Sequence, residues 1–184
     1  MVITLSGVTG SGKSYYKKLL QSKLNLDNQI IYTTRPIRKG EINGIDKFFV
    51  TDEEFNKLEA DRKIIVTFEY LGYRYGYEAS KIKSNTCSII ELHYKIIYKL
   101  KKETNKVFSV YIIPNNIETA KNNLKVRKLE RNQEDLRLKE IEEQAKEFAE
   151  NKELQKQFDY IFYNNYDEKS TKELIRVLKD LNIN

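Results

Sequence analysis

Residues 7–14 read Gly-Val-Thr-Gly-Ser-Gly-Lys-Ser and complete the phosphate-binding pattern Gly-x-x-x-x-Gly-Lys-Ser/Thr. Its glycines permit backbone conformations that turn successive N–H groups inward around phosphate oxygens. Lys13 would reach the β- and γ-phosphates of a nucleoside triphosphate, and the Ser14 hydroxyl would bind Mg²⁺. The pattern therefore predicts a triphosphate and magnesium site formed by Gly7, Thr9, Gly10, Ser11, Gly12, Lys13 and Ser14.

The elements on either side of this loop support that interpretation. Residues 2–6 form a short apolar run typical of a buried strand, and residues 15–24 show a helical pattern. A helix that begins near Lys13 adds the positive end of its dipole to the loop amides. Such a loop does not by itself identify the phosphate acceptor, because GTPases, ATPases and small-molecule kinases share it.

The rest of the chain alternates between strand-like and helical segments, which predicts an α/β fold with a largely parallel sheet. A Ser/Thr-x-x-Glu capping box at Thr51 opens one short helix that ends near Leu58. A hairpin is expected around Leu71-Gly72. The expected strands are 29–33, 48–50, 64–70, 73–77, 87–91, 107–113 and 160–163, and further helices are expected up to 102, at 117–151 and at 168–181.

Composition excludes several classes of protein. The chain has 184 residues, of which 33% are charged and 40% hydrophobic, so a mostly disordered chain is excluded. No apolar run approaches the roughly 18 residues of a membrane span, and Lys13 comes too early for a signal peptide. The single Cys87 excludes an internal disulfide, and the single His93 argues against a histidine metal site. We expect a cytoplasmic globular protein, monomeric or homodimeric.

The net charge is +6, and the excess lies in the first fifty residues, with eight Lys or Arg against three Asp or Glu. A local surplus suits compact phosphates better than a long duplex, so nucleic acid is not favoured as a partner. No membrane partner is expected.

Residues 33–50 read Thr-Thr-Arg-Pro-Ile-Arg-Lys-Gly-Glu-Ile-Asn-Gly-Ile-Asp-Lys-Phe-Phe-Val, which resembles the acceptor-phosphate segment of guanylate kinases. Gly-Tyr-Arg-Tyr-Gly at 72–76 resembles a turn of that family, and residues 158–164 are similar to its closing strand. The resemblance covers nearly the whole chain. It implies a P-loop parallel-sheet core flanked by helices, and transfer of the ATP γ-phosphoryl group to a nucleoside monophosphate, first GMP or dGMP.

The resemblance also implies a set of acceptor residues. Arg35 and Arg38 lie three apart on a loop, so both guanidinium groups could converge on one phosphate, and the family adds the tyrosine matched by Tyr75. Glu91 stands where the family usually has Asp, and an ordinary strand-end carboxylate is an equal alternative. The remaining acceptor positions are Thr34, Glu41, Lys47, Val66, Glu69, Gly76 and His93, and Asn164 belongs to the ATP side.

Arginines of the charged stretch 117–151 match the family's lid. Arg127 and Arg131 match its first two lid arginines, and Arg137 or Lys139 could be the third. They would cover the transferred phosphoryl group, although exposed i,i+4 pairing is an alternative for each. The implied division is a core at 1–32, 85–116 and 151–184, an acceptor-binding flap at about 33–84 and a lid at about 117–150.

The departures from the family fall on positions that read guanine. Ile31 replaces a serine, Val66 replaces a glutamate, and Tyr77 replaces a hydroxyl residue, although a small alignment shift would bring Glu69 to the glutamate position. Loss of a charged acceptor leaves guanine donors unpaired. Another nucleoside monophosphate or a sugar phosphate is therefore an alternative acceptor. A catalytically silent binding module is a second alternative, although such relatives usually lose the P-loop.

Departures at three further positions change the same site in other ways. Glu78 takes the place of a second hydroxyl residue, and His93 takes the place of an aspartate. Lys47 replaces a tyrosine and adds a cation beside the two acceptor arginines. The phosphate-handling residues are therefore expected to be intact and the base-reading residues altered.

Overall fold

The computed structural model describes residues 1–126 and 131–181, and its central element is a five-stranded parallel sheet with the order β2-β7-β1-β8-β9. Leu5 of β1 lies opposite Glu91 of β7, so the carboxyl ends of these two strands meet at one edge of the sheet. This confirms the predicted parallel α/β fold. The strands are β1 (Val2–Gly7), β2 (Asp27–Asn28), β7 (Ser88–Glu91), β8 (Val107–Pro114) and β9 (Tyr160–Asn164).

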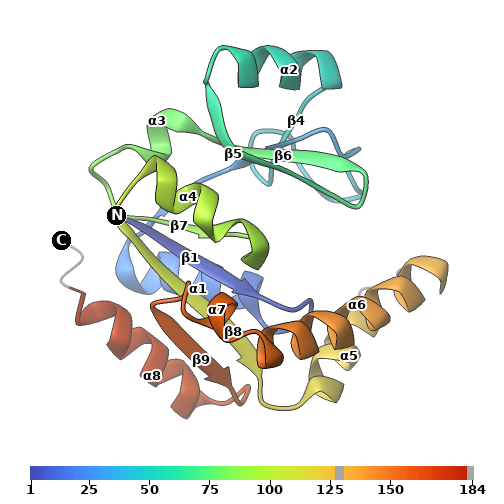
Figure 1. Ribbon diagram of the computed structural model, residues 1–184, viewed down its shortest axis with the longest axis vertical. Helices are drawn as coiled ribbons and strands as arrows, with labels where there is room; N and C mark the ends of the chain where they lie inside the picture. Colours follow the sequence, from blue (N-terminus) through green and yellow to red (C-terminus); the bar gives the residue numbers. More distant parts are fainter. Residues whose placement is uncertain (127–130, 182–184) are drawn as a thin grey trace.

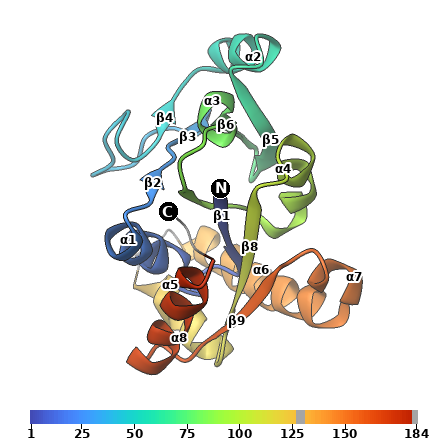
Figure 2. The same ribbon diagram turned by 90° about the vertical axis from the view of Figure 1, so that its left-hand side faces the viewer.

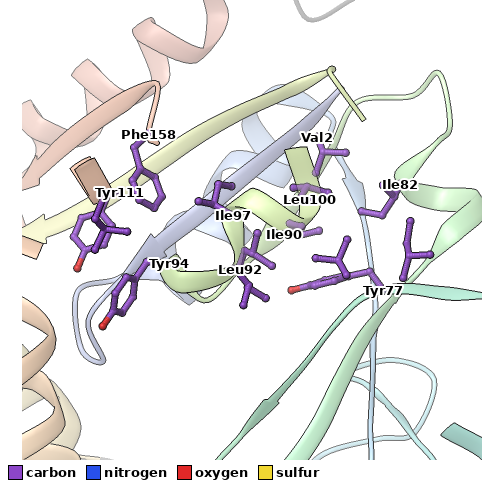
Figure 3. Close-up of a cluster of buried hydrophobic side chains, with 14 of the residues drawn as sticks. Val2, Tyr77, Ile82, Ile90, Leu92, Tyr94, Ile97, Leu100, Tyr111 and Phe158 are labelled. Carbon is purple, nitrogen blue, oxygen red and sulfur yellow. The ribbon is translucent and has the colours of Figure 1, made fainter. Parts of the chain in front are cut away.

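Helices cover both faces of this sheet. On one face, α1 (Lys13–Leu24) and α8 (Glu168–Lys179) pack Leu20 and Leu174 against Ile3 and Leu5 of β1. On the other face, η1 (Tyr94–Ile96), α4 (Ile97–Glu103) and α7 (Lys152–Gln155) contribute to a second apolar cluster, part of which is drawn in Figure 3. Each of these helices is stabilised mainly by the packing of its apolar side, because a short helix is only marginally stable by itself.

A second, four-stranded sheet with the order β4-β3-β6-β5 stands above the first in Figure 1, and the turned view of Figure 2 agrees. Ile65 and Tyr77 of this sheet pack in the same apolar cluster as Ile90 and Leu92, so one core joins the two sheets. Its elements are β3 (Ile31–Thr33), β4 (Phe48–Phe49), α2 (Asp52–Ala60), β5 (Ile64–Tyr70), β6 (Tyr73–Glu78) and α3 (Ala79–Ile82). The Thr51–Glu54 capping box of α2 is present as predicted.

A β-bulge interrupts the β5–β6 hairpin. Ile65 lies opposite Tyr77, but Phe68 lies opposite Tyr75, so two residues of β5 face one residue of β6. Val66 sits in this bulge with a φ of 55°, which is rare for a β-branched side chain. The extra residue reverses the inside–outside alternation of β5 beyond the bulge.

The structure describes two helices within the charged stretch that the sequence predicts as a nearly continuous helix. The first, α5 (Ile117–Lys125), ends with Val126 as its cap, and the second, α6 (Arg131–Glu150), packs Ile141 against Ala120 and Leu124. Lys121 of α5 also pairs with Glu142 of α6 at 2.6 Å. Among the residues that the structure describes, no helix is both long and apolar enough to cross a membrane.

Candidate active site

The P-loop follows β1 directly and leads into α1, as the sequence predicts. Gly7, Gly10 and Gly12 all have positive φ angles, between 81° and 138°, which glycine adopts without a steric cost. The Lys13 ammonium donates hydrogen bonds to the carbonyls of Gly7 and Val8, both at 2.8 Å, and so lies over the loop. Its position fits a cation directed at phosphates that bind in the loop.

Side chains from distant segments hold the P-loop in place. Asn164, at the end of β9, donates to the Ser11 carbonyl at 2.9 Å and accepts from the Tyr16 hydroxyl at 2.9 Å. The Tyr166 hydroxyl and the Asn123 amide both donate to the Gly10 carbonyl, at 3.0 and 3.1 Å. The loop is therefore preorganised by α1, α5 and the segment after β9.

Arg35 is buried in the loop at residues 34–46, with a relative exposure of 6%. Its guanidinium donates to both carboxylate oxygens of Glu41, at 2.7 and 2.8 Å, and to the Pro36 carbonyl at 2.7 Å. Burial alone would raise the pKa of Glu41, but hydrogen bonds from Arg35 and from the Arg38 N–H outweigh it and hold that pKa below its usual value. This ion pair, with the hydrogen bond from the Arg38 N–H to Glu41 at 2.8 Å, fixes the conformation of the loop.

The P-loop and the 34–46 loop open into one cavity of about 1020 Å³ between the two sheets. Between the two loops lies Glu91, whose carboxylate accepts a hydrogen bond from the Ser14 hydroxyl at 3.2 Å. The far end of the cavity is apolar and aromatic, with Phe68 and Tyr75 stacked at 5.2 Å between ring centroids. That end is lined by Ile31, Phe68, Tyr70, Tyr75 and Tyr77.

Helix α6 reaches the small sheet at the rim of this cavity. Arg137 donates to the Tyr70 hydroxyl and to Glu140, and its guanidinium lies 5.1 Å from the centre of the Tyr70 ring. The Tyr70 hydroxyl in turn donates to Glu140. Burial and this last hydrogen bond raise the pKa of Tyr70, so the hydroxyl stays protonated and bridges β5 to α6.

His93 forms part of the cavity wall. Its Nδ1 accepts a hydrogen bond from the Lys95 N–H at 3.3 Å, and its ring stacks on Tyr94 with centroids 4.6 Å apart. Burial lowers the pKa of His93, which favours the neutral ring at pH 7. These contacts suit a wall residue, in agreement with the sequence-based interpretation.

Comparison with known proteins matches one family over nearly the whole chain. The family model described as "Guanylate kinase" matches residues 1–181. The chain belongs to the guanylate kinase family. The guanylate kinase of Wolbachia pipientis wMel is 32% identical over 97% of this chain and 89% of its own length. That of Mycoplasma mobile is 33% identical over 97% of this chain and 92% of its own.

Solved structures support the same fold. The crystal structure of guanylate kinase from Anaplasma phagocytophilum superposes with a TM-score of 0.74, at 24% identity, over 100% of this chain and 87% of that chain. Shikimate kinase from Bacteroides thetaiotaomicron gives a TM-score of 0.53 at 14% identity. The guanylate kinase family fold thus extends over the whole chain.

Most of the site residues that the sequence predicts line this cavity of the guanylate kinase family member. From the triphosphate side these are Gly7, Thr9, Gly10, Gly12, Lys13, Ser14 and Asn164, and from the acceptor side Arg35, Arg38, Glu41, Lys47, Tyr75, Glu91 and His93. Of the two candidates for the third lid cation, Arg137 lines the cavity, whereas Lys139 is an exposed residue of α6.

Several predicted residues lie elsewhere. Val66 packs in the apolar core because of the bulge, and Glu69 is exposed and paired across the hairpin with Arg74, while Phe68 takes the place on the cavity wall. The expectation that Val66 or Glu69 faces the acceptor is therefore corrected. Glu78, the other acid considered, does not line the cavity either.

Four further predicted site residues do not line the cavity. The Thr34 hydroxyl accepts from the Arg74 N–H, and the missing side chain of Gly76 would point at Ile64 and Phe55, so both have structural roles. Ser11 is buried beneath the P-loop and Arg131 is exposed at the start of α6. Arg127 lies outside the described residues.

The cavity also contains residues that the sequence analysis did not single out. They include Lys17, Gln29, Asp46, Tyr70, Asn123 and Tyr166. Lys17 could have been predicted from the sequence, because it follows Lys13 by four residues and so lies on the same helix face. The others come from separate segments, and only their packing brings them to the cavity.

The P-loop provides a first testable prediction, the variant Gly10→Ala. A Cβ at Gly10 would lie 2.1 Å from the Ala120 carbonyl, and the φ of 81° adds strain of about 1–2 kcal/mol for a residue with a side chain. We expect ATP affinity, measured by titration, to fall about tenfold. Gly72→Ala is the matched control, since Gly72 has a φ of 74° but no atom within 4 Å. Unchanged affinity in Gly10→Ala would show that the loop tolerates the displacement.

Proposed function

We propose that this protein transfers the γ-phosphoryl group of ATP to a nucleoside monophosphate, with GMP or dGMP as the first candidate acceptors. The observation that supports this most strongly is the shared cavity, into which the Lys13 loop and the Arg35–Arg38 loop both open. Two phosphate-binding loops on one cavity suit a donor and an acceptor better than a hydrolase. Membership of the guanylate kinase family and relatives that carry that name agree.

The residues would act by holding two phosphate groups in line. The P-loop amides and Lys13 would hold the triphosphate, while Arg38 and Lys47, with the loop fixed by Arg35, would hold the acceptor phosphate. A phosphate oxygen is already anionic near neutral pH, so no general base is needed. Catalysis would then consist of positioning and charge stabilisation in a cavity from which water is excluded.

Magnesium fits the donor set at the carboxyl edge of the sheet. The Ser14 hydroxyl and a Glu91 carboxylate oxygen lie 3.2 Å apart, and oxygen ligands of this kind suit Mg²⁺. Within the described part of the chain, no three His, Cys, Asp or Glu residues form a metal cluster. Bound Mg²⁺ would therefore share its ligands with the ATP phosphates and would neutralise charge on them.

Closure of the cavity would involve two segments. We infer that residues 33–84 act as an acceptor-binding flap and that residues 117–150 act as a lid, with 1–32, 85–116 and 151–184 as the core. The Arg137–Tyr70–Glu140 contacts support this, because they join α6 to the small sheet at the rim. Arg127 and Arg131 are proposed as further lid arginines.

The base of the acceptor would lie against the apolar end of the cavity. Ile31, Phe68 and Tyr77 line this end, and none of them supplies the carboxylate that would pair with the N1 and N2 donors of guanine. Stacking on Tyr75 and Phe68 tolerates any base. We therefore expect weaker discrimination between GMP and other nucleoside monophosphates than a buried charged acceptor would give.

The test is ADP formation from Mg-ATP with GMP, dGMP, AMP, CMP, UMP, dTMP and ribose 5-phosphate in turn, with a control lacking acceptor. Turnover with GMP or dGMP above the control supports the proposed acceptor. Preference for another monophosphate would keep the kinase and replace the acceptor. No turnover with any acceptor, while ATP still binds, would overturn the kinase and favour a binding module.

A further inference from the structure

Two lysines that line the cavity, Lys17 and the Lys47 already proposed to hold the acceptor phosphate, interact electrostatically with one another. Lys17 comes from the second turn of α1, and Lys47 comes from the end of the 34–46 loop. Burial lowers the pKa of each lysine, and both interact electrostatically with Glu91 and with each other. Within residues 1–126 and 131–181, neither ammonium group has a hydrogen-bond or ion-pair partner at contact distance.

Such an arrangement is unfavourable for the protein alone. Ammonium groups taken partly out of water lose hydration, and proteins normally compensate with a directly bound carboxylate or carbonyl. Here Glu91, the carboxylate that acts on both lysines, accepts its hydrogen bond from Ser14. An anion that enters the cavity would supply the missing partner for Lys17 and Lys47.

Other carboxylates at this part of the cavity are already engaged. Glu41 forms the bidentate pair with Arg35, and Asp46 accepts a hydrogen bond from the Ile42 N–H at 2.8 Å. Glu41 interacts electrostatically with Lys47 as well, but its carboxylate is held by Arg35. Glu91 is the acid that acts on both lysines.

The resulting charge balance identifies the class of anion. Apart from the mutually neutralising Arg35–Glu41 pair, Lys17, Lys47 and Arg38 carry three positive charges against the negative charges of Glu91 and Asp46. A phosphate monoester carries nearly two negative charges at neutral pH. One such group would therefore offset the positive surplus of this part of the cavity.

The helix places Lys17 where a donor and an acceptor would meet. Lys17 follows Lys13 by four residues and Ser14 by three, so the three side chains share one face of α1. Lys13 is directed at the P-loop, whereas Lys17 interacts with Glu91 and Lys47 on the acceptor side. Lys17 thus lies one helical turn from the P-loop lysine, on the acceptor side of it.

We propose that Lys17, acting with Lys47, binds the phosphate of the acceptor nucleotide and is a binding residue for the phosphoryl-transfer reaction. This inference rests on the proposed kinase function. It assigns to α1 a second task, since the same helix would then present Lys13 to the donor and Lys17 to the acceptor.

The test compares Lys17→Met with the wild-type protein in steady-state kinetics. Loss of one charged hydrogen bond to phosphate should raise the acceptor KM roughly 10- to 100-fold, while the KM for ATP should change less than about threefold. Lys17→Arg keeps the charge and should recover most of the acceptor affinity. Lys18→Met is the matched control, because Lys18 is the next residue on α1 and is exposed.

Thermal unfolding provides a second measurement that separates a binding role from a structural one. Removal of an unpartnered, partly buried ammonium should leave the unfolding temperature of Lys17→Met equal to or higher than that of the wild type. A purely structural lysine would instead give a lower unfolding temperature together with parallel losses for ATP and acceptor. That result would overturn the inference.

Two further results would decide whether Lys17 binds the acceptor phosphate. An acceptor KM within about twofold of the wild-type value in Lys17→Met would overturn the inference and leave the kinase intact. If the wild-type protein shows no turnover, the proposed function fails, and calorimetric titration of GMP into both proteins with saturating ADP still tests Lys17. Tighter binding by the wild type would support the assignment, and equal or absent binding would overturn it.

Discussion

Replacing Lys13 by alanine is expected to lower kcat for phosphoryl transfer by about 10²- to 10³-fold, the usual effect of removing one preorganised donor from developing charge. The Lys13 ammonium lies 2.8 Å from the carbonyls of Gly7 and Val8, so it is held at the loop in which the triphosphate would bind. In Lys13→Ala, the negative charge that develops on the transferred group would no longer be stabilised by a cation already held in position. The measurement is single-turnover formation of ADP with the preferred acceptor.

Lys18→Ala is the matched control for that experiment, because it removes an exposed lysine from the same helix and should leave kcat unchanged. ATP binding should be measured in parallel, so that a loss of affinity is separated from a loss of rate. A kcat for Lys13→Ala within tenfold of the wild-type value would contradict the role assigned to Lys13. If the protein is a binding module, neither the wild type nor Lys13→Ala will show acceptor-dependent turnover.

The second large effect is expected on stability, from Glu41→Ala. This substitution leaves the Arg35 guanidinium, which has a relative exposure of 6%, without its bidentate partner. Breaking a buried ion pair by removing one member typically costs 3–5 kcal/mol, and the neighbouring cavity admits water, so we expect a loss of about 3 kcal/mol. Urea unfolding without nucleotide measures the difference in the free energy of unfolding.

Lys172→Ala is the control, since it breaks the exposed pair with Glu168 on α8 and should give no measurable change. Glu41→Gln adds a dependence on pH. Because the folded state lowers the pKa of Glu41 from its ordinary 4.5, the stabilisation is fully present above that value and disappears as pH falls through the lowered pKa. The stability difference between wild type and Glu41→Gln should therefore narrow in acid. A constant difference would contradict the ion-pair explanation.

Local sequence determines the triphosphate half of the site. The strand, the glycines, Lys13 and the first turn of α1 lie within a short stretch, so the conformation that each residue requires is set by its immediate neighbours. The capping box at Thr51 and the turn of the β5–β6 hairpin at Leu71-Gly72 are local in the same sense. Parallel pairing of the core strands also follows from the alternation of strands and helices.

The acceptor half depends on contacts between distant residues. Ser14 and Glu91 are 77 residues apart, and Arg137 and Tyr70 are 67 apart, yet both pairs are in contact. No periodicity or motif encodes which side chains meet across such separations. The Lys17–Glu91–Lys47 arrangement is of this kind, because its members come from α1, β7 and a loop.

The sequence by itself therefore determined the parallel core and the P-loop, because these depend on glycine conformations, helix starts and alternating apolar runs, and the motifs at 33–50 and 72–76 indicated the family. Tertiary structure decided which residues line the cavity. One bulge in β5 moves Val66 into the core and places Phe68 on the cavity wall, since an extra residue reverses the alternation of the strand beyond it. The local sequence of β5 does not reveal such an insertion, because a change of register depends on the strand and core that β5 packs against.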